Sequence, residues 1–429
     1  MFTEIRHPAA NEVIASGIFV DAADFRDIEE RIARIETDAA SHEKGKVFEV
    51  FAEALLANLE VVQAKNVWAP VANAPREICE RLNLRPRDKG VDGVIETLDG
   101  RLITYQVKFR TGRPTLNWDD LGNFYGLSRQ ADDTLLFTNC DDFIEEVKDQ
   151  GSITISGSYL DQITLENLQR AIIPSVVEES PKAVITPDPH QERAIADSVQ
   201  HFELNDRGQY ISACGTGKTF TSFWIGKALR ANTILYLVPS LALVKQTIGE
   251  WLKLSETPFP FISVCSDIKT ARKGDTDELV ITQSDLPFAV TTQPEEINDW
   301  VKATENFDFR VVFATYDSAR AVAAGVGDGF GFDLGFFDEA HKTAGTAGTK
   351  YNFALFESNI RIAKRLFMTA TPRFVQARKK TKDGEVGTTL SMDDAELYGE
   401  KYHNFSFYEA RQAGVIVPFK VHVSTITSD

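Results

Sequence analysis

The sequence contains few features of a secreted or membrane protein. Only four cysteines occur in 429 residues, and none belongs to a C-x-x-C or Cys/His pair, which argues against a zinc site or a disulfide framework: Cys79, Cys140, Cys214 and Cys265. No apolar run approaches the roughly 18 to 20 residues that span a bilayer, and the first 15 residues lack the basic and apolar regions of a signal peptide. We therefore expect a cytoplasmic protein without membrane contact.

Positive charge is also scarce. The chain has 46 Lys and Arg against 63 Asp and Glu, a net charge of −17. Proteins that coat nucleic acid replace its counterions with Lys and Arg, so this balance excludes binding through bulk electrostatics. A local basic groove remains possible.

The length exceeds what one hydrophobic core supports and predicts two or three compact units. Four prolines between positions 171 and 190 interrupt regular structure and mark a boundary. We expect an N-terminal helical segment (1–35), an α/β domain (36–172), a Pro-rich linker (173–189), a second domain (190–415) and a short connector (416–429). In the second domain, fully apolar runs alternate with helical patterns, which predicts a doubly wound parallel sheet covered on both faces.

A phosphate-binding loop is indicated at residues 212–219, SACGTGKT, between a strand pattern and a helix pattern. The backbone N–H groups of such a loop cradle phosphate, Lys218 would reach the β and γ phosphates, and the Thr219 hydroxyl would bind Mg²⁺. Ser212 stands where the strict pattern has Gly, but the glycines next to the lysine are kept. The predicted ATP-binding residues of this loop are Gly215, Thr216, Gly217, Lys218 and Thr219.

An acidic pair follows the apolar run LGFF: Asp338 and Glu339 in the string DEAH. At the carboxyl end of a parallel strand, Asp338 would lie near the Mg²⁺ of ATP, and Glu339 would act as the general base on the attacking water. Alone, the pair reads as a helix cap followed by a solvated glutamate. Together with the phosphate-binding loop it favours ATP hydrolysis.

Six strings occur in the order and approximate spacing of the first motor lobe of superfamily 2 helicases and translocases, which the chain resembles over about 190–420: HQERAI, SACGTGKT, LVPSLALVKQT, VVFATYDS, DEAH and MTATPR. TATP together with DEAH resembles the motors of restriction enzymes. The resemblance implies a RecA-like fold in which Gln191 contacts adenine. It also implies that Thr369 and Thr371 couple nucleotide state to DNA grip, and that residues 239–245 and 315–318 touch the phosphate backbone.

By the same resemblance a second lobe is needed, because its arginines stabilise the transferred phosphoryl group. After MTATPR, Ser406 can cap a short helix, Gly414 can end it, and VIVPFKVHVST reads as a strand leaving the lobe. We expect this chain to be the N-terminal part of a longer polypeptide. Alone it should bind ATP but hydrolyse it slowly.

The stretch GVDGVIETLDGRLITYQVKFR, residues 90–110, reads as two strands around a Leu-Asp-Gly turn. Residues two apart on a strand share a face, so Gln106 and Lys108 point the same way, and pairing of the strands brings Asp92 near them. Metal-dependent cleavage of a phosphodiester requires clustered ligands for Mg²⁺ and a cation near the water. Alone, this is more simply a hairpin with a polar edge.

Upstream, Glu49 and Glu53 lie on one face of the predicted helix KVFEVFAEALL. This helix, with GVD and QVK, resembles the Mrr-like branch of PD-(D/E)xK nucleases, in which Gln replaces the usual second acid. The resemblance implies a restriction-endonuclease-like domain that binds Mg²⁺ through Asp92, Gln106 and preferably Glu49, with Lys108 aiding water activation. Arg110 and Arg113 are available for phosphate contacts or are solvated loop residues.

The resulting hypothesis is an α/β protein with two functions, a Mg²⁺-dependent DNA endonuclease and an ATP-driven motor on double-stranded DNA. The combination is similar to the N-terminal part of single-chain Type I/ISP restriction-modification enzymes, in which methyltransferase and target-recognition regions would follow. Two alternatives stay open: a helicase-nuclease of phage defence or repair without a methyltransferase, and a non-catalytic DNA-binding regulatory module with a dead nuclease fold.

Overall fold

The computed structural model describes residues 5–36, 39–85, 90–172, 184–266, 285–375 and 389–417. It divides into two compact units, unit 1 (Met1–Val184 and Ser255–Phe307) and unit 2 (Ile185–Leu254 and Asp308–Asp429). The first division falls inside the expected linker, whereas residues 255–307, which we expected within the second domain, group with unit 1. The Gln63 amide explains part of this grouping, because it accepts from Phe261 N at 2.8 Å and donates to Phe261 O at 3.0 Å.

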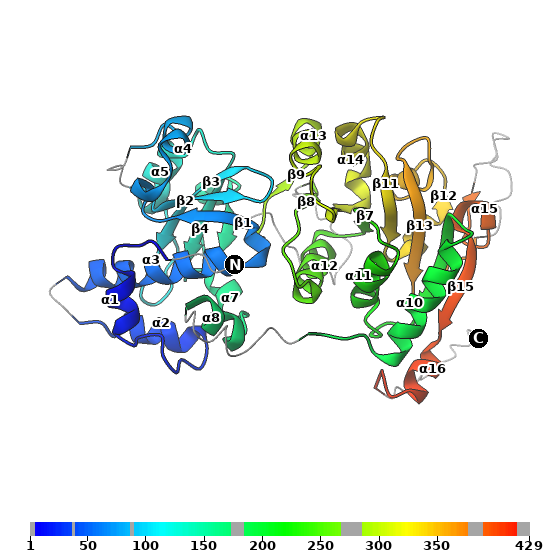
Figure 1. Ribbon diagram of the computed structural model, residues 1–429, viewed down its shortest axis with the longest axis horizontal. Helices are drawn as coiled ribbons and strands as arrows, with labels where there is room; N and C mark the ends of the chain where they lie inside the picture. Colours follow the sequence, from blue (N-terminus) through cyan, green and yellow to red (C-terminus); the bar gives the residue numbers. More distant parts are fainter. Residues whose placement is uncertain are drawn as a thin grey trace, which may run out of the picture. The chain divides into compact units, whose positions relative to one another are not determined.

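Unit 1 is built on a five-stranded mixed sheet in the order β1-β2-β3-β4-β5 (Figure 1). Strands β1 to β3 are antiparallel neighbours, and β3, β4 and β5 are parallel. The elements in chain order are α1 (Ala10–Ala15), α2 (Phe25–Ala33), α3 (Ala40–Asn58), η1 (Glu60–Val62), β1 (Ala64–Trp68), η2 (Val71–Asn73), α4 (Arg76–Arg81), β2 (Gly93–Thr97), β3 (Leu102–Lys108), α5 (Trp118–Leu127), β4 (Asp133–Thr138), α6 (Glu145–Lys148), β5 (Ile153–Ile155), α7 (Gly157–Leu160), α8 (Leu165–Ile172), β8 (Phe261–Val264), β9 (Val290–Thr291) and α13 (Pro294–Ala303).

The core of unit 1 lies on both faces of this sheet, because successive strand residues point to opposite faces. Phe137 on β4 packs against Phe48 of α3, with ring centroids 5.3 Å apart. Its neighbour Leu136 belongs to a cluster on the other face that includes Leu121 and Phe124 of α5. The α/β character predicted for this part of the chain is therefore confirmed.

The predicted hairpin is also confirmed. Strands β2 and β3 pair in antiparallel register with Gly93 opposite Tyr105, around a turn in which Gly100 has φ +81°. Gly93 allows a close approach, since a Cβ atom there would lie 2.4 Å from both the Trp68 carbonyl oxygen and the Tyr105 hydroxyl oxygen. A side chain at 93 would therefore displace the strand that begins directly after Asp92.

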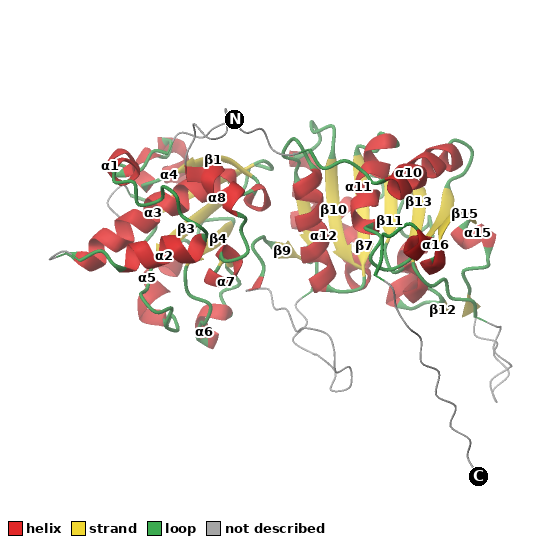
Figure 2. Cartoon of the chain, turned by 90° about the horizontal axis from the view of Figure 1, so that it is seen from below, coloured by secondary structure: helices red, strands yellow, loops and turns green. Residues whose placement is uncertain are grey.

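Unit 2 contains parallel strands in the order β15-β6-β13-β11-β7-β10, which Figure 2 shows side by side with helices around them. This confirms the doubly wound parallel sheet. The elements are α10 (Pro189–Phe202), β6 (Arg207–Ser212), α11 (Lys218–Ala228), β7 (Thr233–Val238), α12 (Leu241–Leu254), β10 (Arg310–Thr315), η4 (Tyr316–Ser318), α14 (Ala319–Val326), β11 (Phe332–Phe337), η5 (Ala340–Thr343), β12 (Gly345–Thr346), η6 (Lys350–Leu355), β13 (Ile362–Thr369), β14 (Thr389–Leu390), α15 (Ala395–Tyr398), β15 (Glu400–Phe405) and α16 (Phe407–Gln412).

The end of the described chain matches the sequence in part. Ser406 caps α16 in a capping box with Glu409, and Gly414 follows the helix at φ +71°, as predicted. Residues 418–429, most of the predicted connector, lie outside the described residues. Within the described ranges, no helix is both long enough and apolar enough to traverse a lipid bilayer.

Candidate functional site

The predicted phosphate-binding loop of unit 2 lies between the end of β6 and the start of α11. Gly215 and Gly217 have φ of +80° and +73°, a region that L side chains rarely adopt. Thr216 is buried, and its Oγ1 donates to Ala213 O at 2.8 Å and lies 2.7 Å from Ser212 Oγ. Ser212, which stands where the usual pattern has Gly, is thus fully buried and contacts the loop through the Thr216 hydroxyl.

Lys218 and Thr219 begin α11 directly behind the loop. The Lys218 Nζ atom lies 3.3 Å from Ser212 O and 3.4 Å from Ala213 O. These contacts are long, and carbonyl oxygens are weaker partners for an ammonium than phosphate oxygens. Lys218 is therefore held over the loop by contacts that a polyphosphate can replace.

Gln191, the predicted adenine contact, is buried and engaged at both ends of its amide. Its Oε1 accepts from Asp188 N at 2.9 Å in the capping box of α10. Its Nε2 lies 3.5 Å from Thr216 O and 3.4 Å from Gly217 O. The side chain supports the phosphate-binding loop in this structure, and an adenine contact stays a prediction.

The acidic pair lies where β11 ends. Asp338 is buried, and burial followed by repulsion from Glu339 raises its pKa to about 6, against the attraction of Lys218. The hydrogen bond with His341 lowers the pKa of Glu339. Glu339 has φ +48°, a conformation that a non-glycine residue adopts at a cost of roughly 1 kcal/mol or more. Such strain is most often found at functional sites.

Two polar contacts join the predicted motor motifs. The His341 Nδ1 atom lies 3.0 Å from Thr369 Oγ1, which also accepts from Thr371 N at 3.1 Å. The Tyr316 hydroxyl donates to the backbone carbonyl of Asp338 at 2.7 Å. His341 was not assigned a role from the sequence, although it lies in the DEAH string, and Tyr316 was included only as a member of the predicted DNA-contacting residues 315–318.

The predicted DNA-contacting segments lie at the same edge of the unit 2 sheet as the predicted ATP-binding residues. Residues 239–245 follow β7 and begin α12, and residues 315–318 follow β10. The carboxyl ends of parallel strands meet at one edge, so these segments share that edge with the phosphate-binding loop and Asp338. Their contact with a phosphate backbone stays a prediction.

In unit 1, Asp92 is fixed beside strand β3. Its N–H donates to Tyr105 O at 2.9 Å, and its Oδ2 accepts from Val107 N at 2.7 Å. Burial and repulsion from Glu49 raise the pKa of Asp92 to about 7, against the Val107 hydrogen bond and the charge of Lys108. The charges of Glu49 and Lys108 thus act on Asp92 in opposite directions, and their joint role in a metal site stays a prediction.

Gln106 lies between the two β3 residues that hold Asp92. Its side chain is buried, and among the described residues its Oε1 has no hydrogen-bond partner. Burial lowers the pKa of Lys108, whereas the charge of Asp92 raises it. Arg110 pairs with Asp120 at 2.6 Å and is about one-third exposed. An unpaired buried amide oxygen costs free energy, and the Gln106 oxygen is therefore free to accept a further partner.

The two candidate glutamates of α3 have different environments. Glu53 is buried, and its carboxylate oxygens accept from Arg6 N at 2.8 Å and His7 N at 2.9 Å. Burial raises its pKa despite both hydrogen bonds. The Glu49 side chain is 36% exposed and contacts His7 Nε2 at 3.2 Å. Because both carboxylate oxygens of Glu53 already accept hydrogen bonds from backbone N–H groups, Glu49 is the better candidate metal ligand.

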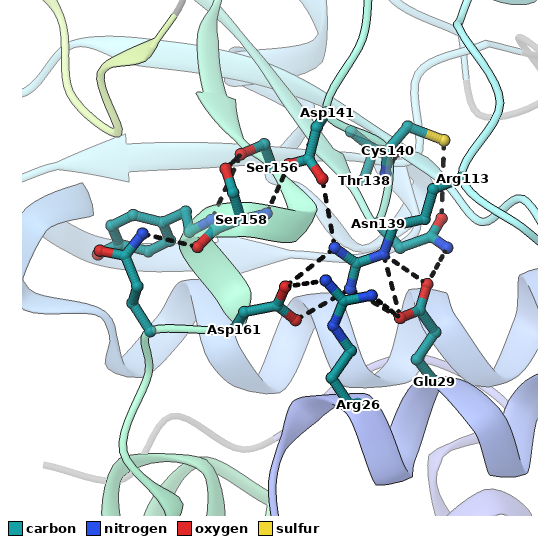
Figure 3. A network of polar contacts seen from close by, with 12 residues as sticks. Arg26, Glu29, Arg113, Thr138, Asn139, Cys140, Asp141, Ser156, Ser158 and Asp161 are labelled. Atoms are coloured by element: carbon teal, nitrogen blue, oxygen red, sulfur yellow. Dashed lines mark hydrogen bonds and ion pairs between the residues drawn. The ribbon is translucent and has the colours of Figure 1, made fainter. Parts of the chain in front are cut away.

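Arg113 has a structural role. Its side chain is only 11% exposed and pairs with Glu29 at 2.7 Å, Asp161 at 2.9 Å and Asp141 at 3.3 Å (Figure 3). Arg26, which lies on α2, also pairs with Asp161. These ion pairs link α2 to the loops that follow β4 and α7. Arg113 is thus not free for the phosphate contact that we considered, and neither is it a solvated loop arginine.

The residues around Asp92 offer the type of ligand that Mg²⁺ prefers, but fewer charged ligands than a complete site needs. Mg²⁺ prefers oxygen ligands and commonly takes one or two carboxylates and several waters. Asp92, Glu49 and the unpartnered Gln106 oxygen supply such a set. However, the described ranges contain no group of three or more His, Cys, Asp or Glu placed to hold a metal, so Gln106 and water would have to complete the site.

Comparison with known families supports the assignment of unit 2. Residues 184–374 match the family model described as "Type III restriction enzyme, res subunit". Among curated proteins, the "Probable helicase A859L" of African swine fever virus is 27% identical over 301 residues in the Kenyan isolate KEN-50, covering 67% of this chain and 31% of the relative. The Pretoriuskop isolate's version is 26% identical over 234 residues, covering 54% and 24%.

Among solved structures, the chain is similar to the "ATP-dependent Type ISP restriction-modification enzyme LlaBIII bound to DNA", with a TM-score of 0.68 and 26% identity over 90% of this chain and 25% of that one. A nuclease-deletion mutant of the Type ISP enzyme LlaGI also matches, at TM-score 0.43 with 31% identity over 54% of this chain and 21% of that one. The chain spans at most about a third of the relatives named here. Unit 2 is a RecA-like, helicase-like lobe related to Type ISP restriction enzymes.

Proposed function

We propose that this chain combines an ATP-driven DNA motor lobe with a Mg²⁺-dependent DNA endonuclease and forms the N-terminal part of a restriction enzyme that acts on double-stranded DNA. The observation that carries the proposal is the orphaned Gln106 oxygen beside Asp92 and Lys108, in a chain that also holds a phosphate-binding loop and an acidic pair. Each set contains buried or strained polar groups that cost free energy, and such groups are most often found at functional sites.

In the motor lobe, the loop N–H groups and Lys218 would bind the β and γ phosphates. Thr219 and Asp338 would hold the Mg²⁺ that accompanies ATP. Glu339, positioned by its contact with His341 at 3.2 Å, would orient the attacking water. With one lobe alone, the arginines of a second lobe would be missing, and the charge that develops in the transition state would be less well stabilised. We therefore expect this chain to bind ATP but to hydrolyse it slowly.

In unit 1, Asp92, Glu49 and the Gln106 carbonyl would hold Mg²⁺, which supplies Lewis-acid polarisation of the phosphate when bound. Asp92 must be ionised to act as a ligand, and a divalent cation favours that form. Lys108, half-buried and within reach of the charge of Asp92, would hold the attacking water and stabilise charge that develops on the phosphate oxygens. The Gln106 amide adds no charge, which gives Glu49 a larger share in holding the metal.

The comparisons support this assignment beyond the motor lobe. The likeness to LlaBIII extends over 90% of the chain, which is more than unit 2 contains. That enzyme is described as ATP-dependent and bound to DNA, and on this basis we assign ATP and DNA to the present chain. Methylation and target recognition would belong to further parts of the polypeptide.

The test is Mg²⁺-dependent nicking of supercoiled plasmid, measured together with binding of a fluorescent ATP analogue. Asp92→Ala and Lys108→Ala should abolish nicking and leave ATP binding unchanged. Lys218→Ala should weaken ATP binding at least tenfold, because it removes charge-assisted contacts, and leave basal nicking unchanged. Parent protein that does not cut DNA, even when joined to a second motor lobe, would refute the nuclease assignment.

One observation favours a second candidate, a non-catalytic DNA-binding module with an inactive nuclease fold. The described residues of unit 1 hold no three-carboxylate cluster, and the position of the usual second acid is Gln106. In that case the chain should bind DNA with the same affinity with and without Mg²⁺, and Asp92→Ala should not change that affinity. The plasmid assay together with a DNA-binding titration separates the two candidates.

A further inference from the structure

The first residues of the described chain reach the candidate metal site of unit 1. Glu53 accepts the backbone N–H groups of Arg6 and His7, and Asn73 Nδ2 donates to Arg6 O at 3.1 Å. The Arg6 guanidinium lies 5.9 Å from the centroid of the Trp68 ring. Residues 5–9, which we name the N-terminal arm, are thus fixed against α3 and the loop after β1.

This anchoring sets the position of one side chain. His7 is 12% exposed, its Nδ1 accepts from Ala9 N at 3.2 Å, and its Nε2 lies 3.2 Å from Glu49 Oε2. A neutral imidazole that accepts at Nδ1 carries its proton on Nε2, so Nε2–H donates to Glu49. Both ring nitrogens are therefore used, and the ring is directed at the carboxylate.

Glu49 would otherwise be poorly fixed. Its side chain is 36% exposed, and its Oε1 lies over Gly45, 4.0 Å from where a Cβ atom would be. A long, partly exposed carboxylate must lose rotamer freedom when it binds a metal, which weakens the binding. A hydrogen bond that holds the carboxylate in advance reduces this loss, as outer-shell partners of metal ligands do.

We propose that His7 is a positioning residue for the nuclease metal, a residue that orients Glu49 by a hydrogen bond from Nε2 while Glu53 fixes the backbone of the arm. The inference rests on the proposed nuclease function. His7 touches neither metal nor DNA in this role, and it compensates for the missing charge at Gln106 by making Glu49 a better ligand.

The experiment compares three variants of the full chain. His7→Ala removes the donor. His7→Gln places an amide N–H near the position of Nε2. His42→Ala makes the same substitution at an exposed position of α3. Two quantities are measured, the Mg²⁺ dependence of plasmid nicking, and binding of Mn²⁺ followed by electron paramagnetic resonance without nucleotide, with Asp92→Ala as the blank. Thermal unfolding shows whether each variant is folded.

We expect His7→Ala to raise the half-saturating Mg²⁺ concentration and to weaken Mn²⁺ binding, each by about tenfold, with a smaller change of the rate at saturating metal. His7→Gln should recover most of the affinity, and His42→Ala should match the parent. A purely structural role would lower the saturated rate of His7→Ala without a shift in metal affinity, and that result overturns the inference. If the parent neither nicks DNA nor binds Mn²⁺ through Asp92, the proposed function itself fails, and the role of His7 fails with it.

Discussion

The hydroxyl of Tyr316 donates a hydrogen bond to the backbone carbonyl of Asp338 at 2.7 Å, which joins the end of β10 to the acidic pair after β11. Tyr316 is buried, and its ring packs near Phe337 and Tyr351. The segment predicted to touch DNA is thereby bonded to the residue predicted to bind the Mg²⁺ of ATP. A shift of either segment must disturb the other.

Tyr316→Phe should therefore weaken binding of Mg²⁺-ATP by roughly three- to tenfold, because the Asp338 carbonyl loses its partner and the carboxylate loses its fixed position. The control is Tyr398→Phe, which removes another buried tyrosine hydroxyl, 3.0 Å from Thr343 Oγ1. Both variants should lose about 1 kcal/mol of stability in urea unfolding. Equal Mg²⁺-ATP affinities for the two variants would contradict the proposed coupling.

Cys214 provides a chemical test of the phosphate-binding loop. It is the exposed cysteine among the four, while Cys79 is half-buried and Cys140 and Cys265 are buried. N-ethylmaleimide should modify Cys214 first and abolish ATP binding, because the adduct would fill the space for phosphate. Excess Mg²⁺-ATP should slow the modification, as measured by mass spectrometry of the labelled peptide.

The matched control is Cys214→Ala, which should bind ATP like the parent and lose its sensitivity to the reagent. If modified parent protein retained full ATP affinity, phosphate would not lie where the loop geometry indicates. Modification of Cys140 or Cys265 ahead of Cys214 would also count against the loop geometry, since both are buried.

The pKa of Asp92 predicts how the stability of metal-free unit 1 depends on pH. The folded-state pKa of about 7 lies above the ordinary value of 3.8, so the folded state binds more protons between these values. The contribution of Asp92 to stability must then fall as pH rises through this window, and its penalty is complete above pH 7. Asp92→Asn should remove the penalty, since the amide oxygen can still accept from Val107 N.

In chemical denaturation with EDTA at pH 8, Asp92→Asn should be more stable than the parent by roughly 1–2 kcal/mol, a figure reduced for solvent screening of a partly exposed side chain. The difference should shrink as pH falls from 7 towards 4. Asp119→Asn removes the same charge from an exposed position of α5 and should show no comparable trend. A parent that gains stability on going from pH 5 to pH 8 relative to Asp92→Asn would refute the argument.

The sequence predicted those parts of the fold whose signals are local. The turn at Gly100 and the alternation around Gln106 and Lys108 determine the hairpin, and the glycines beside Lys218 determine the loop. These features depend on residues near one another in the chain, so the pattern contains them.

Features set by contacts between distant residues could not be predicted in this way. The Gln63 amide pairs with the backbone of Phe261 across 198 positions, and no local pattern encodes this contact. Strand β15 has the polar sequence EKYHNF, which lacks the pattern of a buried strand, and it forms through its parallel pairing with β6. The contact between His7 and Glu49 spans 42 positions and depends on how Glu53 holds the N-terminal arm.

Gln106→Glu tests the candidate metal site by adding a carboxylate, which restores the usual second acid. In the metal-free protein a new buried carboxylate would lie beside Asp92 and within range of Glu49, and like charges in a buried site destabilise the fold. With a divalent cation the same charge becomes a ligand. The variant should therefore be less stable than the parent in EDTA by roughly 1–3 kcal/mol and should need several-fold less Mg²⁺ for half-maximal nicking.

Gln106→Met keeps the volume and removes the carbonyl, so it serves as the matched control. It should be as stable as the parent or more stable without metal, because the unpartnered Oε1 is gone, and it should need more Mg²⁺ than the parent. Gln106→Glu should thus lower both the metal-free stability and the Mg²⁺ concentration needed, whereas Gln106→Met should keep or raise the stability and raise the Mg²⁺ concentration needed. If both variants cut DNA with the Mg²⁺ dependence of the parent, the Gln106 oxygen is not a metal ligand, and the buried unpartnered amide would need another explanation.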